Sequence, residues 1–316
     1  MPQIARQTTS STLAERHDAP TLTPIPTEYR RHQKVFSEEA AQRFPESRVW
    51  DHAIELKPGT PSTLPGKIYA LSQLELQELQ KFVKEHLAKG YIRPSKSPYA
   101  APFFFIKKKD GKLRPVQDYR RLNEWTIRNR YPLPLIPQLI NRARMKKLFT
   151  KFDVRWGYNN VCIKEGDEWK AAFIMNEGLY EPTVMFFGLT NSPATFQAMM
   201  NAIFEDEIQE GWLMVYMDNM LIATPDDPVL HRECVHHVLD KLEKHDLYLK
   251  PEKCAFTQRR IEFLGVVLDN NTIQMDPTKI KGVAECISIF TKNFSRLVQA
   301  CTSHNSPPSD KPTSQV

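Results

Sequence analysis

The chain has 316 residues, of which 41% are hydrophobic and 10% aromatic, so it can bury a sizeable core in one large domain or a few subdomains. Its five cysteines include no C-x-x-C pair, which argues against a zinc site or a disulfide framework and favours a reducing interior. No stretch reaches the ~18 apolar residues of a membrane span, and residues 1–6 lack the apolar core of a signal peptide. We therefore expect an intracellular protein that is not secreted.

Positive charge is concentrated in one part of the chain. The net charge is +6, but residues 103–155 carry 15 Lys/Arg and 4 Asp/Glu, a local net of +11 that leaves the remainder at −5. A basic block inside a folded region favours a polyanionic partner such as nucleic acid. A solvated charged face explains the same charge equally well, so charge alone leaves both interpretations open.

The first half of the chain predicts a leader, a linker, a helix and a basic hairpin, in that order. Residues 1–26 are rich in Thr, Ser and Pro and are typical of a disordered leader, and 27–66 form an N-terminal linker segment. Apolar residues recur at helical spacing over 72–90, where Ser72 can cap the start and Gly90 the end. Strand-like runs at 98–106 and 112–116 flank an Asp-Gly turn, which predicts a hairpin with a lysine-rich tip, and a short helix is expected to end near residue 147.

The second half predicts a mixed fold. The order over 148–268 is strand, hairpin (170–184), helix, hairpin (212–223), helix and strand (261–268). Ser192 with Pro193 and Asp227 with Pro228 are typical helix starts. This order predicts an α+β fold with a ferredoxin-like sandwich, in which one sheet is backed by two helices.

Two acidic residues stand where strands are expected to end. The apolar runs 212–217 and 220–223 flank Asp218 and Asn219, which predicts a hairpin with this polar pair as its turn, because Asp and Asn tolerate positive φ. Asp153 closes a strand-like run 65 residues upstream. Two strand-borne carboxylates can share divalent metal ions, and paired metals drive phosphoryl transfer. Taken alone, the Asp-Asn pair is more simply an ordinary turn.

Five motifs in a fixed order resemble the reverse transcriptase of gypsy-class long-terminal-repeat retrotransposons. They span Lys107 to Asn123, Phe152 to Tyr158, Phe187 to Gln197, Tyr216 to Asp218, and Lys253 to Gly265, and the resemblance runs over about residues 26–282. It implies a right-hand polymerase fold. We expect fingers at 67–147 (with part of the palm), a ferredoxin-like palm at 148–270, a truncated thumb remnant at 271–300 and a disordered tail at 301–316.

The resemblance implies an RNA-directed DNA polymerase that uses two Mg²⁺ (or Mn²⁺) ions. Asp153, Asp218 and the backbone carbonyl of Val154 would hold the metals, which prefer hard oxygen ligands. The implied partners are an RNA or DNA template, a DNA or RNA primer and deoxynucleoside triphosphates. The implied location is a cytoplasmic retroelement particle or the nucleus.

The resemblance also implies the remaining site residues. Lys108 and Arg114 would clamp the triphosphate, and the ring of Tyr158 would stack under the sugar and exclude a 2′-hydroxyl. The other implied roles are a nucleotide floor at Phe187 and Gly188, a position near the template strand for Gln197, protonation of pyrophosphate by Lys253, and a primer grip at Phe263, Leu264 and Gly265. Without the family pattern, Lys108 and Lys253 are solvated lysines, Tyr158 is a core aromatic, and 263–265 is a buried strand.

Asn219 departs from the family pattern, which has a second Asp at this position. Asn keeps one oxygen but loses the charge, so we expect weaker binding of the catalytic metal and a lowered rate. Beyond about residue 282 the pattern breaks, whereas relatives continue into a full thumb, a ribonuclease H and an integrase. These two features leave open a decayed copy and a catalytically inactive nucleic-acid-binding remnant. An unrelated two-carboxylate nuclease or phosphotransferase leaves the basic hairpin unexplained.

Overall fold

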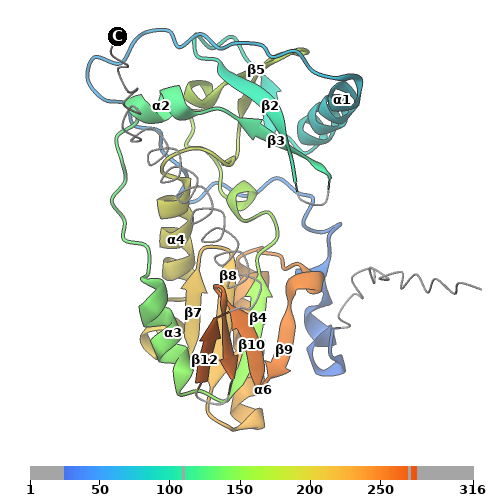
Figure 1. Ribbon diagram of the computed structural model, residues 1–316, viewed down its shortest axis with the longest axis vertical. Coiled ribbons are helices and arrows are strands. Elements are labelled where there is room, and N and C mark those ends of the chain that lie inside the picture. Colours follow the sequence, from blue (N-terminus) through green and yellow to red (C-terminus); the bar gives the residue numbers. More distant parts are fainter. Residues whose placement is uncertain (1–24, 109–110, 270–271, 276–316) are drawn as a thin grey trace, which may run out of the picture.

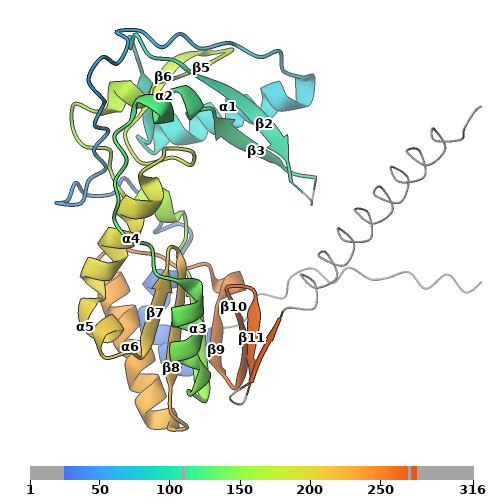
Figure 2. The ribbon, with the colours of Figure 1, turned by 60° about the vertical axis from the view of Figure 1, so that its left-hand side comes forward.

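The computed structural model describes residues 25–108, 111–269 and 272–275, which form two lobes, one above the other (Figure 1). The upper lobe holds a five-stranded sheet and the lower lobe a four-stranded sheet, with helix α4 (Ser192–Ile203) lying between them (Figure 2). Within these ranges no helix is long and apolar enough to cross a membrane. The expected disordered leader and tail, and most of the expected thumb remnant, lie outside the described residues.

The upper lobe corresponds to the expected fingers. Helix α1 (Gln73–Ala88) begins with a capping box, in which the Ser72 hydroxyl accepts from the Glu75 N–H and the Glu75 carboxylate accepts from the Ser72 N–H. The helix packs Leu79, Phe82 and Val83 against the sheet. The predicted helix over 72–90 is therefore confirmed. The other elements of this lobe are β1 (Ile92–Pro94), β2 (Ala101–Lys107), β3 (Leu113–Gln117), α2 (Arg120–Trp125), η3 (Glu168–Ala171), β5 (Phe173–Met175) and β6 (Gly178–Pro182).

The fingers sheet contains strands from two distant parts of the chain. Its order is β1-β6-β5-β2-β3, and β2 and β3 form the predicted basic hairpin, with Ile106 opposite Arg114. The hairpin β5–β6 was expected in the palm, and this expectation was wrong, because β5 pairs in parallel with β2 and β6 pairs with β1. The choice of sheet is decided by pairing over long sequence separations, which the local pattern does not contain.

The lower lobe confirms the predicted ferredoxin-like palm. Its sheet runs β9 (Ala255–Gln258), β4 (Leu148–Asp153), β8 (Asn219–Thr224) and β7 (Leu213–Tyr216), with every neighbouring pair antiparallel. In chain order these strands and the two helices α4 and α6 (Pro228–Lys244) follow a β-α-β-β-α-β sequence. Asp227 caps α6 through its side chain, as expected from the Asp-Pro start.

Both faces of the palm sheet are buried, where the sequence predicted helices on one face only. On one face, α4, α6 and the N-terminal η1 (Thr27–Phe36) cover Phe152, Met220 and Ile222. On the other, α3 (Ile136–Arg144) and the strands β10 (Arg260–Phe263) and β11 (Val266–Asp269) cover Phe149, Met214 and Leu221. Because both faces of the sheet are buried, the sequences of these strands are continuous apolar runs and do not alternate between apolar and polar residues. Residues 27–36, expected within a linker segment, thus contribute Tyr29 and Phe36 to the core.

Two local predictions were wrong in detail. Residues 261–268 are not one strand, because Leu264 and Gly265 adopt φ of 49° and 85° and turn the chain between β10 and β11, which join β12 (Thr272–Met275) in a separate sheet. Helix α4 begins at Ser192 with Asn191 at the cap position, so Ser192 is not the cap. The helix also stops earlier than its apolar pattern suggested, and α5 (Glu205–Gln209) follows. The remaining short elements are η2 (Gly157–Asn160) and η4 (Pro251–Lys253).

Candidate functional site

The hairpin β7–β8 presents Asp218 at its tip, but the turn lies one residue earlier than predicted. Tyr216 pairs with Asn219, so the two turn residues are Met217 and Asp218, and Asn219 is the first residue of β8. Met217 has a φ of 56°, whereas a two-residue turn with positive φ at its first position normally takes Gly. The turn is therefore strained and must be held in place by its surroundings.

Gln197 on α4 holds this turn from below. Its Oε1 accepts a hydrogen bond of 2.8 Å from the Met217 N–H, and its Nε2 donates to Asn201 Oδ1 and to the Val215 carbonyl. The side chain is fully buried and its polar atoms are bonded within the protein. Gln197 therefore positions the hairpin, and its implied place near the template strand stays a prediction.

Asp153 and Asp218 meet at the same end of the palm sheet. Asp153 is the register partner of Asn219, and the Asp218 carbonyl accepts a 2.8 Å hydrogen bond from the Val154 N–H. Burial, and then the negative charge of Asp153, raise the pKa of Asp218 above its ordinary value. The folding of the two strands therefore brings two carboxylates together in a partly desolvated place.

Two lysines bind the Asp153 carboxylate, and only one of them was singled out in the sequence. Lys253 Nζ lies 3.1 Å from Oδ2, and Lys250 Nζ lies 2.8 Å from Oδ1. Lys250 reaches Asp153 because Leu249 pairs with Val154 and the Lys250 N–H donates to the Asp153 carbonyl. Nothing local in the sequence marks Lys250, since this pairing joins segments almost a hundred residues apart.

The donor set at this end of the sheet suits a divalent cation in kind but is one carboxylate short. Asp153 and Asp218 supply hard oxygen ligands, whereas Asn219 supplies an amide whose Nδ2 donates to Asp218 Oδ1 at 3.2 Å. Within the described ranges, no three His, Cys, Asp or Glu side chains come together in a way that could hold a metal ion. Asn219 thus supplies no negative charge, and Lys250 and Lys253 neutralise the Asp153 carboxylate that a divalent cation would bind.

A small hollow beside Asp218 is walled by aromatic rings. It has a volume of about 60 Å³ and is lined by Gly157, Tyr158, Phe187, Phe196, Met217 and Asp218. The rings of Tyr158 and Phe187 lie 4.8 Å apart, and the Arg114 guanidinium lies over Phe187 at 5.3 Å. Burial and the Asp218 charge raise the pKa of Tyr158 to about 12. A continuous series of contacts therefore connects the basic fingers hairpin to the carboxylates of the palm.

The other predicted site residues do not line this hollow. Lys108 is exposed at the hairpin tip, where its backbone pairs with Lys112. Gly188 adopts a φ of 102°, and an added Cβ would lie 3.2 Å from the Gln117 carbonyl oxygen, so the fingers and this loop touch only because the residue is Gly. Phe263 is buried in the palm core, and Leu264 and Gly265 form the turn after it.

The fingers also carry an aromatic and basic surface that the sequence analysis did not single out. Tyr69 and Phe104 meet edge to face at 6.0 Å, and Lys67 Nζ lies 5.6 Å from the Tyr69 ring. Arg120 and Arg121 line an adjoining open hollow of about 510 Å³. Aromatic rings next to cations are typical of surfaces that bind single-stranded nucleic acid. The basic and aromatic residues of 67–69 were the signal available in the sequence.

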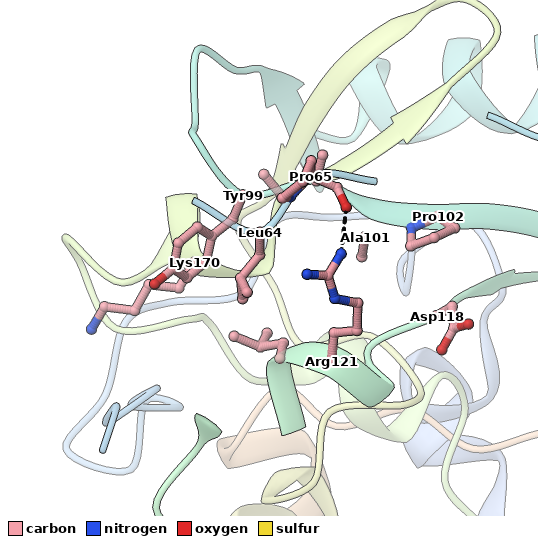
Figure 3. Close-up of a pocket in the computed structure, with 11 residues that line it drawn as sticks. Leu64, Pro65, Tyr99, Ala101, Pro102, Asp118, Arg121 and Lys170 are labelled. Atoms are coloured by element: carbon pink, nitrogen blue, oxygen red, sulfur yellow. Dashed lines mark hydrogen bonds between the residues drawn. The ribbon is translucent and has the colours of Figure 1, made fainter. Parts of the chain in front are cut away.

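A second, smaller hollow lies in the fingers. Its volume of about 20 Å³ is close to that of one water molecule, and apolar residues such as Leu64 and Tyr99 line it. Arg121 extends across it and donates to the Pro65 carbonyl at 2.8 Å (Figure 3). This hydrogen bond ties the chain before α1 to helix α2.

Comparison with known proteins identifies the relatives of this chain. A family model described as reverse transcriptase (RNA-dependent DNA polymerase) matches residues 106–268. The Tf2-7 and Tf2-3 transposon polyproteins of Schizosaccharomyces pombe are each 34% identical over 242 residues, which cover 76% of this chain and 18% of the relative. The chain therefore spans less than a fifth of the length of these relatives.

Solved structures give the same fold. The foamy viral protease–reverse transcriptase in complex with an RNA/DNA hybrid has a TM-score of 0.70 and 19% identity, covering 79% of this chain and 33% of that one. The native prototype foamy virus protease–reverse transcriptase has a TM-score of 0.65 and 22% identity, covering 78% of this chain and 32% of that one. At this identity the likeness establishes the polymerase fold alone.

Proposed function

Because the chain belongs to the reverse transcriptase family, we propose that it is the fingers and palm of an RNA-directed DNA polymerase from a retrotransposon. In the proposed reaction, a primer 3′-hydroxyl attacks the α-phosphate of a deoxynucleoside triphosphate, a phosphodiester bond forms and pyrophosphate leaves. We propose that Asn219 slows this reaction, because it removes one negative charge from the place where the catalytic metal ions would be held.

The observation that carries the proposal is the continuous contact from fingers to palm. Arg114 lies over Phe187, Phe187 packs on Tyr158, and Tyr158 shares a hollow with Asp218. A triphosphate bound by Lys108 and Arg114 would therefore lie close to the carboxylates, with its sugar on Tyr158. Two-carboxylate nucleases and phosphotransferases need no such basic hairpin, so this arrangement favours a polymerase.

The family generally uses divalent metal ions, and we propose two Mg²⁺ or Mn²⁺ ions here. Bound by Asp153, Asp218 and the Val154 carbonyl, they would activate the hydroxyl and hold the leaving pyrophosphate. Asp153 must exchange its contacts with Lys250 and Lys253 when a cation binds. Lys253 lies 3.1 Å from the Asp153 carboxylate, and we propose it as the proton donor to the leaving pyrophosphate.

We propose an RNA or DNA strand as template, paired with a primer. The foamy viral neighbours include structures in complex with RNA/DNA hybrid and with double-stranded DNA. In this chain, the basic block 103–155 and the Tyr69–Phe104 surface supply cations and stacking faces. Binding by phosphate contacts should weaken steeply as the salt concentration rises.

The replacement Asn219→Asp tests the proposal directly. It restores a carboxylate beside Asp153, so primer extension on a polyriboadenylate template should become faster by roughly 10-fold or more, with a lower Mg²⁺ requirement. Extension is measured with an oligodeoxythymidylate primer, dTTP, and Mg²⁺ or Mn²⁺. Asn176→Asp, at the exposed β5–β6 turn, makes the same charge change far from the carboxylates and should leave the rate unchanged.

A catalytically inactive nucleic-acid-binding remnant is the second candidate, and the lysines on Asp153 favour it. Lys250 and Lys253 balance that carboxylate without any metal. This candidate predicts tight, salt-sensitive binding of the hybrid but no extension by the wild type or by Asn219→Asp. Such a result would replace the polymerase proposal with the remnant.

A further inference from the structure

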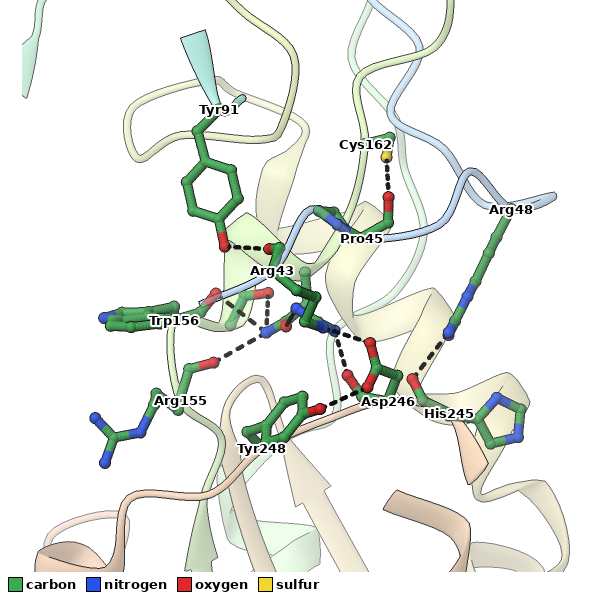
Figure 4. Close-up of polar contacts among 12 residues, drawn as sticks. Arg43, Pro45, Arg48, Tyr91, Arg155, Trp156, Cys162, His245, Asp246 and Tyr248 are labelled. Carbon is green, nitrogen blue, oxygen red and sulfur yellow. Dashed lines mark hydrogen bonds and ion pairs between the residues drawn. The ribbon is translucent and has the colours of Figure 1, made fainter. Parts of the chain in front are cut away.

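The chain between η1 and residue 48 crosses from the palm to the fingers, and we call residues 37–48 the crossing segment. On the fingers side, the Tyr91 hydroxyl donates to the Arg43 carbonyl at 2.9 Å. On the palm side, Arg48 donates to the His245 carbonyl at 2.9 Å. From above the segment, the Cys162 thiol donates to the Pro45 carbonyl (Figure 4). Figure 4 shows the segment passing between Tyr91 above and the Asp246 and Tyr248 side chains below.

Arg43 is the residue of this segment that reaches furthest into the palm. Its guanidinium donates to both the carboxylate and the carbonyl of Asp246, and it lies over the Tyr248 ring at 5.0 Å (Figure 4). Its third contact is a 3.1 Å hydrogen bond from Nη1 to Asn160 Oδ1. One planar guanidinium thus bridges two separate loops, which a lysine ammonium cannot do in the same geometry.

The contact with Asn160 fixes which way its amide points. Arginine can only donate hydrogen bonds, so the oxygen of the amide must face Arg43 and its nitrogen must face away. That nitrogen donates to the carbonyls of Arg155, Trp156 and Gly157, at 2.9, 3.2 and 3.4 Å. Trp156 has a φ of 48°, so these bonds hold a strained stretch of backbone.

The loop 155–160 leads directly into the candidate site. It starts two residues after Asp153 and carries Gly157 and Tyr158, which both line the hollow at Asp218. A Cβ added to Gly157 would lie 3.5 Å from the Asp218 Cβ, so the loop backbone packs against the residue that bears the carboxylate. The second loop that Arg43 holds continues through Tyr248, whose carbonyl accepts from the Arg155 N–H at 2.6 Å.

We propose that Arg43 is a positioning residue for nucleotide selection: through Asn160 it sets the loop that carries Tyr158, and so the distance between that ring and the sugar of the bound nucleotide. The proposal rests on the polymerase function proposed above. Arg43 itself touches neither carboxylate of the site. It acts from a segment that the sequence pattern assigns to a linker.

Two measurements on Arg43→Lys, with Arg48→Lys as the matched control, test this role. The first is hydrogen exchange of the amides of Asn159 and Val161, which are bonded within the loop. Loss of a bridging charged hydrogen bond should speed their exchange by about 10-fold, whereas Arg48→Lys should leave it unchanged. The second is the ratio of dTTP to UTP incorporation, which should fall several-fold in Arg43→Lys because a displaced ring excludes the 2′-hydroxyl less well.

Loss of folded protein lowers both incorporation rates equally and leaves their ratio unchanged, so the ratio separates positioning from stability. An unchanged ratio with a slower rate, or exchange that rises throughout the palm instead of in the loop, would overturn the proposal. If no variant extends a primer, the polymerase function fails, and loop exchange still decides whether Arg43 holds the loop. Asn160→Ala should reproduce the exchange change, and combining it with Arg43→Lys should add little.

Discussion

The polar side chains at the two ends of the paired strands β4 and β8 differ in their surroundings. At one end, both ring nitrogens of the buried His231 have hydrogen-bond partners within the protein. These partners are the hydroxyls of Thr224 and Thr150, at 2.8 Å each. At the other end, five residues along, Asp153 lies opposite Asn219 and next to the strained turn at Asp218. The first arrangement stabilises the fold, and the second holds like charges together, as sites that bind an external partner do.

The largest expected effect comes from Asp218→Asn at the charged end. The variant keeps the shape of the side chain but loses a carboxylate, so primer extension should fall by about 10²-fold or more. The protein should also become more stable at neutral pH, because the raised pKa of Asp218 means that its ionised form is unfavourable in the fold. Extension assays and thermal melting measure the two effects.

The gain in stability of Asp218→Asn over the wild type should depend on pH, because only the ionised form of Asp218 is unfavourable in the fold. Below its pKa, Asp218 is already neutral, so the melting temperatures of wild type and variant should converge as the pH falls. Asp226→Asn, at an exposed carboxylate paired with Arg259, is the matched control and should change neither extension nor this convergence. Full extension by Asp218→Asn would show that this end of the strands is not the catalytic one.

At the satisfied end, acid should destabilise the protein through His231. Burial lowers the pKa of His231 to about 4, so between pH 6.5 and 4 the unfolded chain takes up a proton that the folded chain does not. The free energy of unfolding contributed by His231 is fully present above pH 6.5 and is lost as the pH falls through about 4. Relative to His231→Gln, the wild type should lose about 3 kcal/mol over this range. Urea unfolding at a series of pH values measures the difference, and parallel curves would contradict it.

The smallest expected effect concerns the strained turn. Met217→Gly removes the cost of a positive φ, so it should raise the free energy of unfolding by up to about 1 kcal/mol. Tyr216→Gly in the adjoining strand has no such strain to relieve and also deletes a ring packed against the core, so it should lower stability by more than that amount. Destabilisation by Met217→Gly as well would mean that the turn is unstrained.

Local chemistry accounts for what the sequence predicted well. Ser72 with Glu75 and Asp227 with Pro228 mark helix starts because the capping groups lie within three residues of the backbone they bind. The hairpin at Asp218 was predicted from its flanking apolar runs, but its turn was placed one residue late. Nothing in the sequence says that Met217, rather than Asn219, adopts positive φ, because Gln197 on another element stabilises that choice.

Contacts between distant segments account for what was missed. Lys250 reaches Asp153 only through the pairing of Leu249 with Val154, and Arg43 bonds to Asn160 across 117 residues of sequence. The turn at Leu264 and Gly265 did leave a signal, since a Gly inside a strand-like run often marks a bend. The sequence therefore identified the carboxylates of the candidate site and Lys253, but not Lys250 on Asp153 or Arg43 on the loop.

The interleaved order of the fingers sheet has a consequence for synthesis on the ribosome. Strand β1 emerges early, but its partner β6 is made only after the whole of β4, almost ninety residues later, so the fingers cannot close until Pro182 has been translated. Until β5 has been made, β2 presents an open edge that a neighbouring nascent chain could pair with. Neither lobe can be excised or exchanged as one uninterrupted stretch, and recombination within 148–182 would break both at once.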